Sequence, residues 1–129
     1  MSDYSKVNLL EIENLSKNDG LKTHFARKYL DSKDLGVSLY RYEPNCRSAM
    51  AHSHQVQEEA YVVVSGSGNI LLDGKLVAIK QWDTIRVAPK VSRAFESGSD
   101  GMVVIAIGGP KPPESDGVRQ TPDWPDDEK

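Results

Sequence analysis

Short stretches in which apolar and polar residues alternate follow one another along most of this chain. The clearest lies in residues 35–45, where the alternation runs from Val37 to Tyr42 and stops at a Pro-Asn turn. A period of two is typical of strands, because successive side chains point to opposite faces. About eight such segments recur every ~8–12 residues, and no segment has a convincing helical period. The pattern predicts an all-β fold, either a sandwich or a small barrel, with little or no helix.

Residues typical of turns separate these segments. Asp73 and Gly74 lie between two apolar runs, and they predict a type I′ hairpin because both central residues of that turn need positive φ. GSGN at 66–69 and GSDG at 98–101 are likewise interpreted as turns between strands. The expected strands are 8–15, 23–30, 35–45, 59–66, both sides of the hairpin in 66–80, 82–89, 91–97 and 101–109.

Composition indicates one domain of ordinary size. The chain has 129 residues, 38% of them hydrophobic, and a formal net charge of −3. Its longest apolar runs have the length of a strand, well short of the ~18–20 residues that span a bilayer, so no membrane partner is expected. From about residue 111 to 129 the sequence is rich in proline and acidic residues, which predicts an extended tail that Trp124 could pin to a domain over residues 1–110.

Charge and cysteine content exclude further classes. Lysine and arginine residues are scattered rather than clustered, unlike the basic stripe with which nucleic-acid binders neutralise phosphates. The single cysteine, Cys46, excludes an internal disulfide, and the N-terminus lacks the pattern of a signal peptide. We therefore expect a cytoplasmic protein that does not bind nucleic acid.

Candidate chemistry is concentrated in residues 51–68, which carry two of the three histidines of the chain. On a strand His52 and His54 would share a face, and Glu59, at the start of the next apolar run, could supply a carboxylate beside them. Glu58 would point to the opposite face. Two imidazoles and one carboxylate suit Fe(II), Mn(II), Zn or Ni and leave positions open for a ligand. The alternative is an ordinary strand that happens to carry two histidines.

The spacing of these residues resembles a known motif. Two histidines, a glutamate and a closing glycine, here His52, His54, Glu59 and Gly66, resemble the first motif of the cupins, which are double-stranded β-helix (jelly-roll) barrels. Residues 81–97 are similar in layout to the second cupin motif. The resemblance covers about residues 35–107 and implies a cupin barrel with a pocket inside it.

The second motif departs from the cupin pattern at important positions. Trp82 stands where the family has a glycine, and Arg93 stands where it has a third metal-binding histidine. Arginine stays protonated and is essentially never a metal ligand. Three alternatives remain open. Arg93 pairs with Glu59 in a metal-free pocket, or it turns to the pocket mouth and clamps an anionic ligand beside a metal ion, or it points outward into solvent.

The resemblance therefore implies a pocket for a small polar or anionic ligand, with a divalent metal ion at His52, His54 and Glu59. If the protein is an enzyme, we expect a metal-dependent oxygenase or isomerase, since cupins include both. The alternative is a metal-free binding, sensory or structural cupin. The candidate ligand-binding residues are Arg93, Tyr61, Tyr42 and Phe95.

Alternation alone also selects residues that could line the barrel, although packing in the core is the default role for each. Cupin barrels expose sheet edges, so a homodimer is expected, with residues 8–15 as an added strand. The residues expected to face the interior are Tyr40, Tyr42, Tyr61, Ile70, Leu72, Ile85, Val87, Phe95, Val103 and Ile105.

Overall fold

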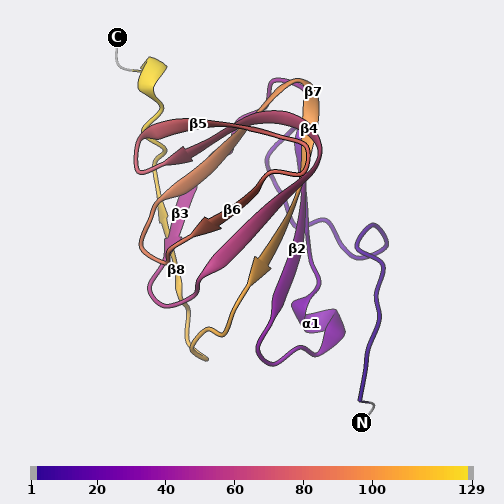
Figure 1. Cartoon of the computed structure of the whole chain (residues 1–129). Coiled ribbons are helices and arrows are strands. Elements are labelled where there is room, and N and C mark those ends of the chain that lie inside the picture. Colours follow the sequence, from indigo (N-terminus) through magenta and orange to yellow (C-terminus); the bar gives the residue numbers. More distant parts are fainter. Residues whose placement is uncertain (1–2, 128–129) are drawn as a thin grey trace.

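Strands dominate this computed structural model, which describes residues 3–127 (Figure 1). In chain order the elements are β1 Leu21–Phe25, α1 Arg27–Leu30, β2 Gly36–Tyr42, β3 Ala51–His54, β4 Glu59–Leu72, β5 Lys75–Lys80, β6 Thr84–Val87, β7 Arg93–Gly108, β8 Gly117–Gln120 and the 3-10 helix η1 Pro125–Asp127. The prediction of an all-β jelly roll with little helix is confirmed. Neither described helix is long and apolar enough to cross a membrane.

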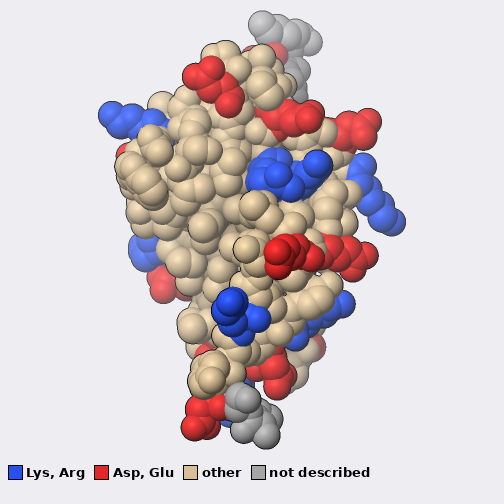
Figure 2. Space-filling model, turned by 90° about the vertical axis from the view of Figure 1, so that its right-hand side faces the viewer, with Lys and Arg blue, Asp and Glu red and all other residues tan. Residues whose placement is uncertain are grey.

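Two long strands, β4 and β7, organise the barrel. They pair antiparallel along most of their length, from the Glu59–Gly108 pair to the Leu72–Arg93 pair. β4 also pairs with β5 and β6, whereas β7 also pairs with β2 and β3, so that the sheet curls on itself. β1 and β8 are the outer strands of the path β1-β2-β7-β3-β8. On the face shown in Figure 2, acidic and basic side chains are interspersed.

The great length of β4 and β7 corrects two predictions of turns. GSGN and GSDG both lie inside these strands, where Gly66 and Gly101 each have a φ of 75°. The β4–β7 register shifts between Val63 and Ser65 and again between Gly66 and Gly68. Bulges with a glycine at positive φ let a strand bend without ending, which is why turn-like residues do not interrupt these two.

The same bulges reverse the alternation within β7. Val103 and Ile105, which were predicted to face the interior, are only partly buried. Their neighbours Met102, Val104 and Ala106 are at most 2% exposed and take the interior positions. Between Gly66 and Gly68 the pairing moves two positions along β4 but five along β7, from Met102 to Ser97, and this odd step reverses which side chains of β7 face the interior.

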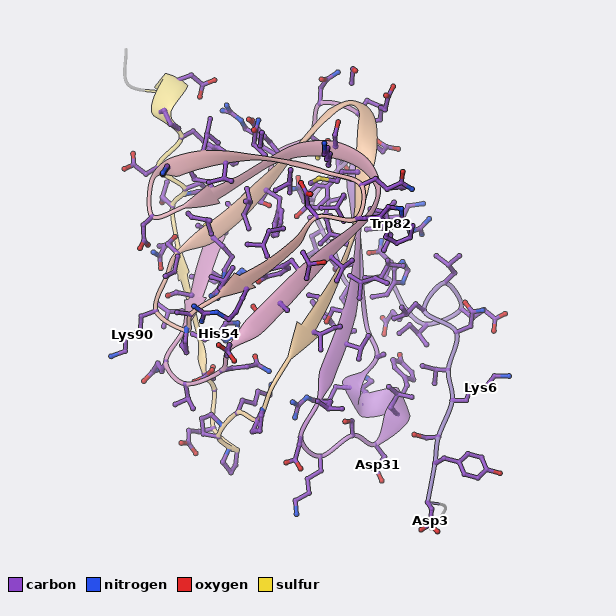
Figure 3. All side chains as sticks on the ribbon, viewed as in Figure 1. Asp3, Lys6, Asp31, His54, Trp82 and Lys90 are labelled. Atoms are coloured by element: carbon purple, nitrogen blue, oxygen red, sulfur yellow. The ribbon has the colours of Figure 1, made fainter. Side chains whose placement is uncertain are left out.

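The Asp73–Gly74 hairpin joins β4 to β5 as predicted. Asp73 has a φ of 48° and Gly74 a φ of 83°, as a type I′ turn requires. Trp82 also has a positive φ, 74°, and its side chain is 67% exposed and projects outward in Figure 3. This backbone conformation explains why the cupin pattern has glycine at that position.

The N-terminal region differs from the prediction in two places. Residues 8–15 form no strand, because asparagine side chains bind the backbone locally: Asn8 Oδ1 accepts from Leu10 N–H, and Asn14 Oδ1 accepts from Ser16 N–H. The strand predicted at 23–30 ends at Phe25 and is followed by α1. Residues 8–15 are therefore not a strand within the single chain, and their pairing with a second copy stays a prediction.

The C-terminal segment, defined here as residues 111–127, is attached to the barrel rather than merely extended. Its strand β8 pairs with β3 along the register from Ala51–Gln120 to His54–Gly117. Trp124 is 5% exposed and packs in a small apolar cluster with Ala51, Leu71 and Ala94. Trp124 thus holds the segment against the body, as the sequence suggested.

Candidate metal centre

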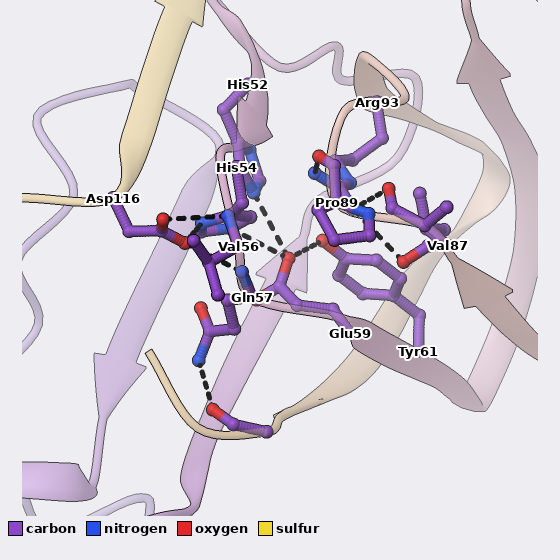
Figure 4. Close-up of polar contacts among 12 residues, drawn as sticks. His52, His54, Val56, Gln57, Glu59, Tyr61, Val87, Pro89, Arg93 and Asp116 are labelled. Atoms are coloured by element: carbon purple, nitrogen blue, oxygen red, sulfur yellow. Dashed lines mark hydrogen bonds and ion pairs between the residues drawn. The ribbon is translucent and has the colours of Figure 1, made fainter. Parts of the chain in front are cut away.

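Three side chains of the first motif converge near one end of β3 (Figure 4). His52 and His54 lie on β3, and Glu59 is the first residue of β4. His52 Nε2 is 3.4 Å and His54 Nε2 is 3.2 Å from Glu59 Oε1. The three potential ligand atoms all lie within 4.8 Å of one another. The structure thus brings together the three residues that were predicted as metal ligands.

The structure also distinguishes the two adjacent glutamates. Glu59 is partly buried and faces the histidines, whereas Glu58 is exposed and accepts a 2.9 Å bond from Arg86 Nη1 on the outside. The alternation of side chains at the start of β4 separates them, as the sequence indicated. Glu58 cannot therefore join the cluster without a change of strand register.

The surroundings of Glu59 favour its ionised form. Burial opposes its ionisation, but contacts from His52 and His54 and a 2.5 Å hydrogen bond donated by the Tyr61 hydroxyl outweigh burial and hold the pKa of Glu59 well below its usual range. All three contacts fall on Oε1. The carboxylate is thus ionised at neutral pH, as a metal ligand must be.

A second carboxylate, which sequence reasoning missed, lies behind His54. Asp116 is 4% exposed, and its Oδ2 lies 3.2 Å from His54 Nδ1. Its two oxygens also accept 2.9 Å bonds from the N–H groups of Val56 and Gln57. Although burial alone would raise it, these N–H groups and His54 hold the pKa of Asp116 below its usual value. In the sequence, Asp116 lies in a turn-like stretch of the proline-rich tail, and no motif there marks it as a residue of the site.

Arg93 takes none of the three orientations considered from the sequence. It is 0% exposed, so it is not solvated, and no ion pair joins it to Glu59 within the described part of the chain. Its guanidinium donates instead to the carbonyls of Val87, Ala88 and Pro89, at 3.5, 3.2 and 3.4 Å. A buried cation requires such acceptors, and the turn after β6 supplies them.

The three aromatic candidates lie behind the centre. Tyr61, Tyr42 and Phe95 are at most 6% exposed and belong to the main core cluster. The Phe95 ring lies 5.0 Å from that of Tyr61 and 6.1 Å from that of Tyr42. Tyr61 reaches the centre through its hydroxyl, whereas the Tyr42 hydroxyl contacts Ser48. Neither these aromatics nor Arg93 line the groove described next.

The centre opens into a groove of about 1080 Å³. One wall comes from β1, β2 and the segment before β1, and the other comes from β3 and the C-terminal segment. Tyr40, expected from alternation to face the interior, lies in this lining. The only acidic residue of the described lining is Glu59, and the basic ones are Lys17, Arg27, Lys111 and Arg119.

The comparisons with known proteins agree with this architecture. A family model described as "Cupin domain" matches residues 38–108, more than half of the chain. The chain belongs to the cupin family. No curated protein matches it. The cupin match ends before Asp116, so that the carboxylate behind His54 lies outside the matched region.

Several solved structures have the same fold. A cupin protein from Bacteroides fragilis is 22% identical with a TM-score of 0.72, covering 89% of this chain and 91% of its own. A sugar phosphate isomerase of the cupin superfamily from Silicibacter pomeroyi is 20% identical with a TM-score of 0.70, covering 84% and 77%. A variant of Streptomyces PAC13 with uridine is 21% identical with a TM-score of 0.76, covering 95% and 93%.

Proposed function

We propose that this cupin holds a divalent metal ion at His52, His54 and Glu59 and binds a small anionic molecule beside it. The convergence of these three donors on an open groove is the observation that supports the proposal. Two imidazoles and a carboxylate suit Fe, Mn, Zn or Ni and leave coordination positions free for a ligand. If the protein is an enzyme, this donor set favours a metal-dependent isomerase or oxygenase.

The side chains around the centre have the chemical properties that a divalent metal ion requires of its ligands. Glu59 is ionised, and His54 has a carboxylate at Nδ1, which leaves Nε2 as the ligand atom. The buried Tyr61 hydroxyl holds one Glu59 oxygen in place. A bound divalent ion would supply Lewis-acid polarisation of a ligand oxygen. The chain itself orients the donors and binds the ligand in the groove.

The charge of the groove supports an anionic ligand. Four basic residues and one carboxylate line it, in a chain with a net charge of −3. Grooves that concentrate one sign of charge attract ligands of the opposite sign. The sugar phosphate isomerase among the similar structures acts, by its name, on an anion. A carboxylate or phosphate group on a small molecule would fit this groove.

The metal proposal predicts a sharp difference between the two adjacent glutamates. Metal-free protein, prepared with a chelator, is titrated calorimetrically with Zn²⁺ and with Mn²⁺. We expect binding of about one ion per chain, weakened at least ~100-fold in Glu59→Gln, because a ligand matters at least as much as its supporting partners. Glu58→Gln should bind like the wild type, because Glu58 lies outside the centre. A wild type that binds no divalent ion would refute the proposal.

The anion proposal makes a separate prediction about Arg27, which lines the groove. With inorganic phosphate and citrate as probes, NMR shift perturbations should concentrate on groove residues, and Arg27→Gln should weaken binding at least ~3-fold through loss of one nearby charge. Arg86→Gln is the matched control, because Arg86 is exposed and paired with Glu58 outside the groove. Equal effects of the two substitutions would contradict an anion site there.

One observation favours a second candidate, a metal-free binding or sensory cupin. Arg93 places a fixed cation where the cupin pattern has its third metal-binding histidine, so that only three ligands remain. In that case the groove would bind anions while the titration showed no metal ion. Cytoplasmic location and a homodimer remain predictions.

A further inference from the structure

The strand that carries both histidines pairs more extensively with the C-terminal segment than with the rest of the barrel. β3 pairs with β7 only through His52 and Arg93. All four of its residues, by contrast, pair with β8 in the C-terminal segment. Trp124 adds apolar contact behind the strand, next to Ala51. The position of the histidines therefore depends on residues that follow the cupin match as well as on β7 and the turn after β6.

Asp116 is the point where the C-terminal segment reaches the centre itself. It immediately precedes β8, and its buried carboxylate lies against His54 Nδ1 at 3.2 Å. The same carboxylate accepts from the N–H groups of Val56 and Gln57, which lie in the connection between β3 and Glu59. One side chain thus contacts a histidine ring and the loop that sets the distance between that ring and Glu59 (Figure 4).

We propose that Asp116 is a positioning residue for the metal centre. When a metal ion is bound, the Asp116 carboxylate faces the Nδ1 side of the His54 ring, so that Nε2 is the nitrogen directed at the ion beside Glu59. It also fixes the spacing between the histidine strand and Glu59. A carboxylate on the far nitrogen of a ligating histidine orients the ring and increases its basicity. This inference rests on the proposed metal site and extends it to a segment outside the cupin match.

A merely structural role is the rival account, because Asp116 also binds backbone. Asp116→Asn removes the charge at His54 Nδ1 and keeps the size of the side chain. The matched control is Asp126→Asn in the same segment: Asp126 pairs with Arg47, and its side chain is 63% exposed. Both variants lose a carboxylate of the C-terminal segment, but only the first loses one next to the centre.

Two readouts test the proposal: the affinity for Zn²⁺, and the NMR shifts of the His54 ring in the Zn²⁺-loaded protein. We expect the loaded wild type to show coordination through Nε2 of His54 and a hydrogen-bonded Nδ1–H, with His52 in the same spectrum as an internal reference. Asp116→Asn should shift the Nδ1–H resonance upfield, because an amide oxygen is a weaker acceptor than a carboxylate, and it should weaken Zn²⁺ binding ~10–100-fold, the usual effect of losing such a partner. Asp126→Asn should change neither.

The outcomes separate this inference from the proposed function. A wild type that binds Zn²⁺, with unchanged affinity and Nδ1–H resonance in Asp116→Asn, would overturn the inference alone, even if that variant melts at a lower temperature. A Zn²⁺-loaded wild type in which His54 coordinates through Nδ1 would overturn it without any variant, so the test survives a variant that fails to fold. A wild type that binds no Zn²⁺ refutes the metal site itself.

Discussion

Replacing Arg93 with alanine is expected to lower the free energy of unfolding by about 3–5 kcal/mol. The side chain is 0% exposed, and its guanidinium donates to three carbonyls at the end of β6. Removal leaves a cavity and takes a donor from each of those carbonyls. One of them, Pro89 O, also accepts from the His54 N–H at 2.7 Å, so Arg93 supports the backbone of the centre.

Urea unfolding of wild type, Arg93→Ala and Arg86→Ala measures this difference. Arg86 is the control because its side chain is 68% exposed, and its loss should change stability by less than about 0.5 kcal/mol. A loss below about 1 kcal/mol for Arg93→Ala would mean that the guanidinium is not held in the interior. It would then be free to reach the groove and clamp a ligand.

Gly66→Ala is expected to destabilise the barrel by about 2–5 kcal/mol, as the sum of backbone strain and overpacking. Gly66 has a φ of 75°, and a Cβ added there would lie 2.1 Å from the carbonyl oxygen of Gly101. That oxygen belongs to the backbone of β7 and cannot move without disturbing the central strand pair. The closing glycine of the first motif is thus a requirement of the bulge in β4, distinct from the metal chemistry.

Gly117→Ala is the matched control for this substitution. Nothing lies within 4 Å of a Cβ at Gly117, and its φ is not in the left-handed region. Its stability should match that of the wild type or increase by a few tenths of a kcal/mol, because alanine restricts the unfolded chain. Equal stability of Gly66→Ala and wild type in thermal unfolding would contradict the bulge geometry.

Much of the candidate centre follows from strand periodicity. A period of two puts His52 and His54 on one face and separates Glu59 from Glu58, and the structure shows this arrangement. The Asp73–Gly74 turn was predictable for the same kind of local reason, because its φ values require those residues. Local geometry is encoded within a few neighbouring residues, so it can be predicted from them.

The features that could not be predicted depend on contacts between distant parts of the chain. Asp116 meets His54 only because β8 returns to pair with β3, and no local pattern in a proline-rich segment indicates that. The orientation of Arg93 depends on carbonyls that the turn after β6 happens to present. Val103 and Ile105 were assigned to the wrong face because bulges change the phase without a distinctive sequence.

The most direct test of the metal centre is an anomalous difference map from a crystal of the wild-type protein loaded with one equivalent of Zn²⁺. The account predicts one strong peak at ~2.0–2.2 Å from His52 Nε2, His54 Nε2 and a Glu59 oxygen, the usual lengths of such bonds. His54 Nδ1 should remain next to Asp116. A peak elsewhere, for instance at His24 or among the C-terminal acidic residues, or no peak at all, would contradict it.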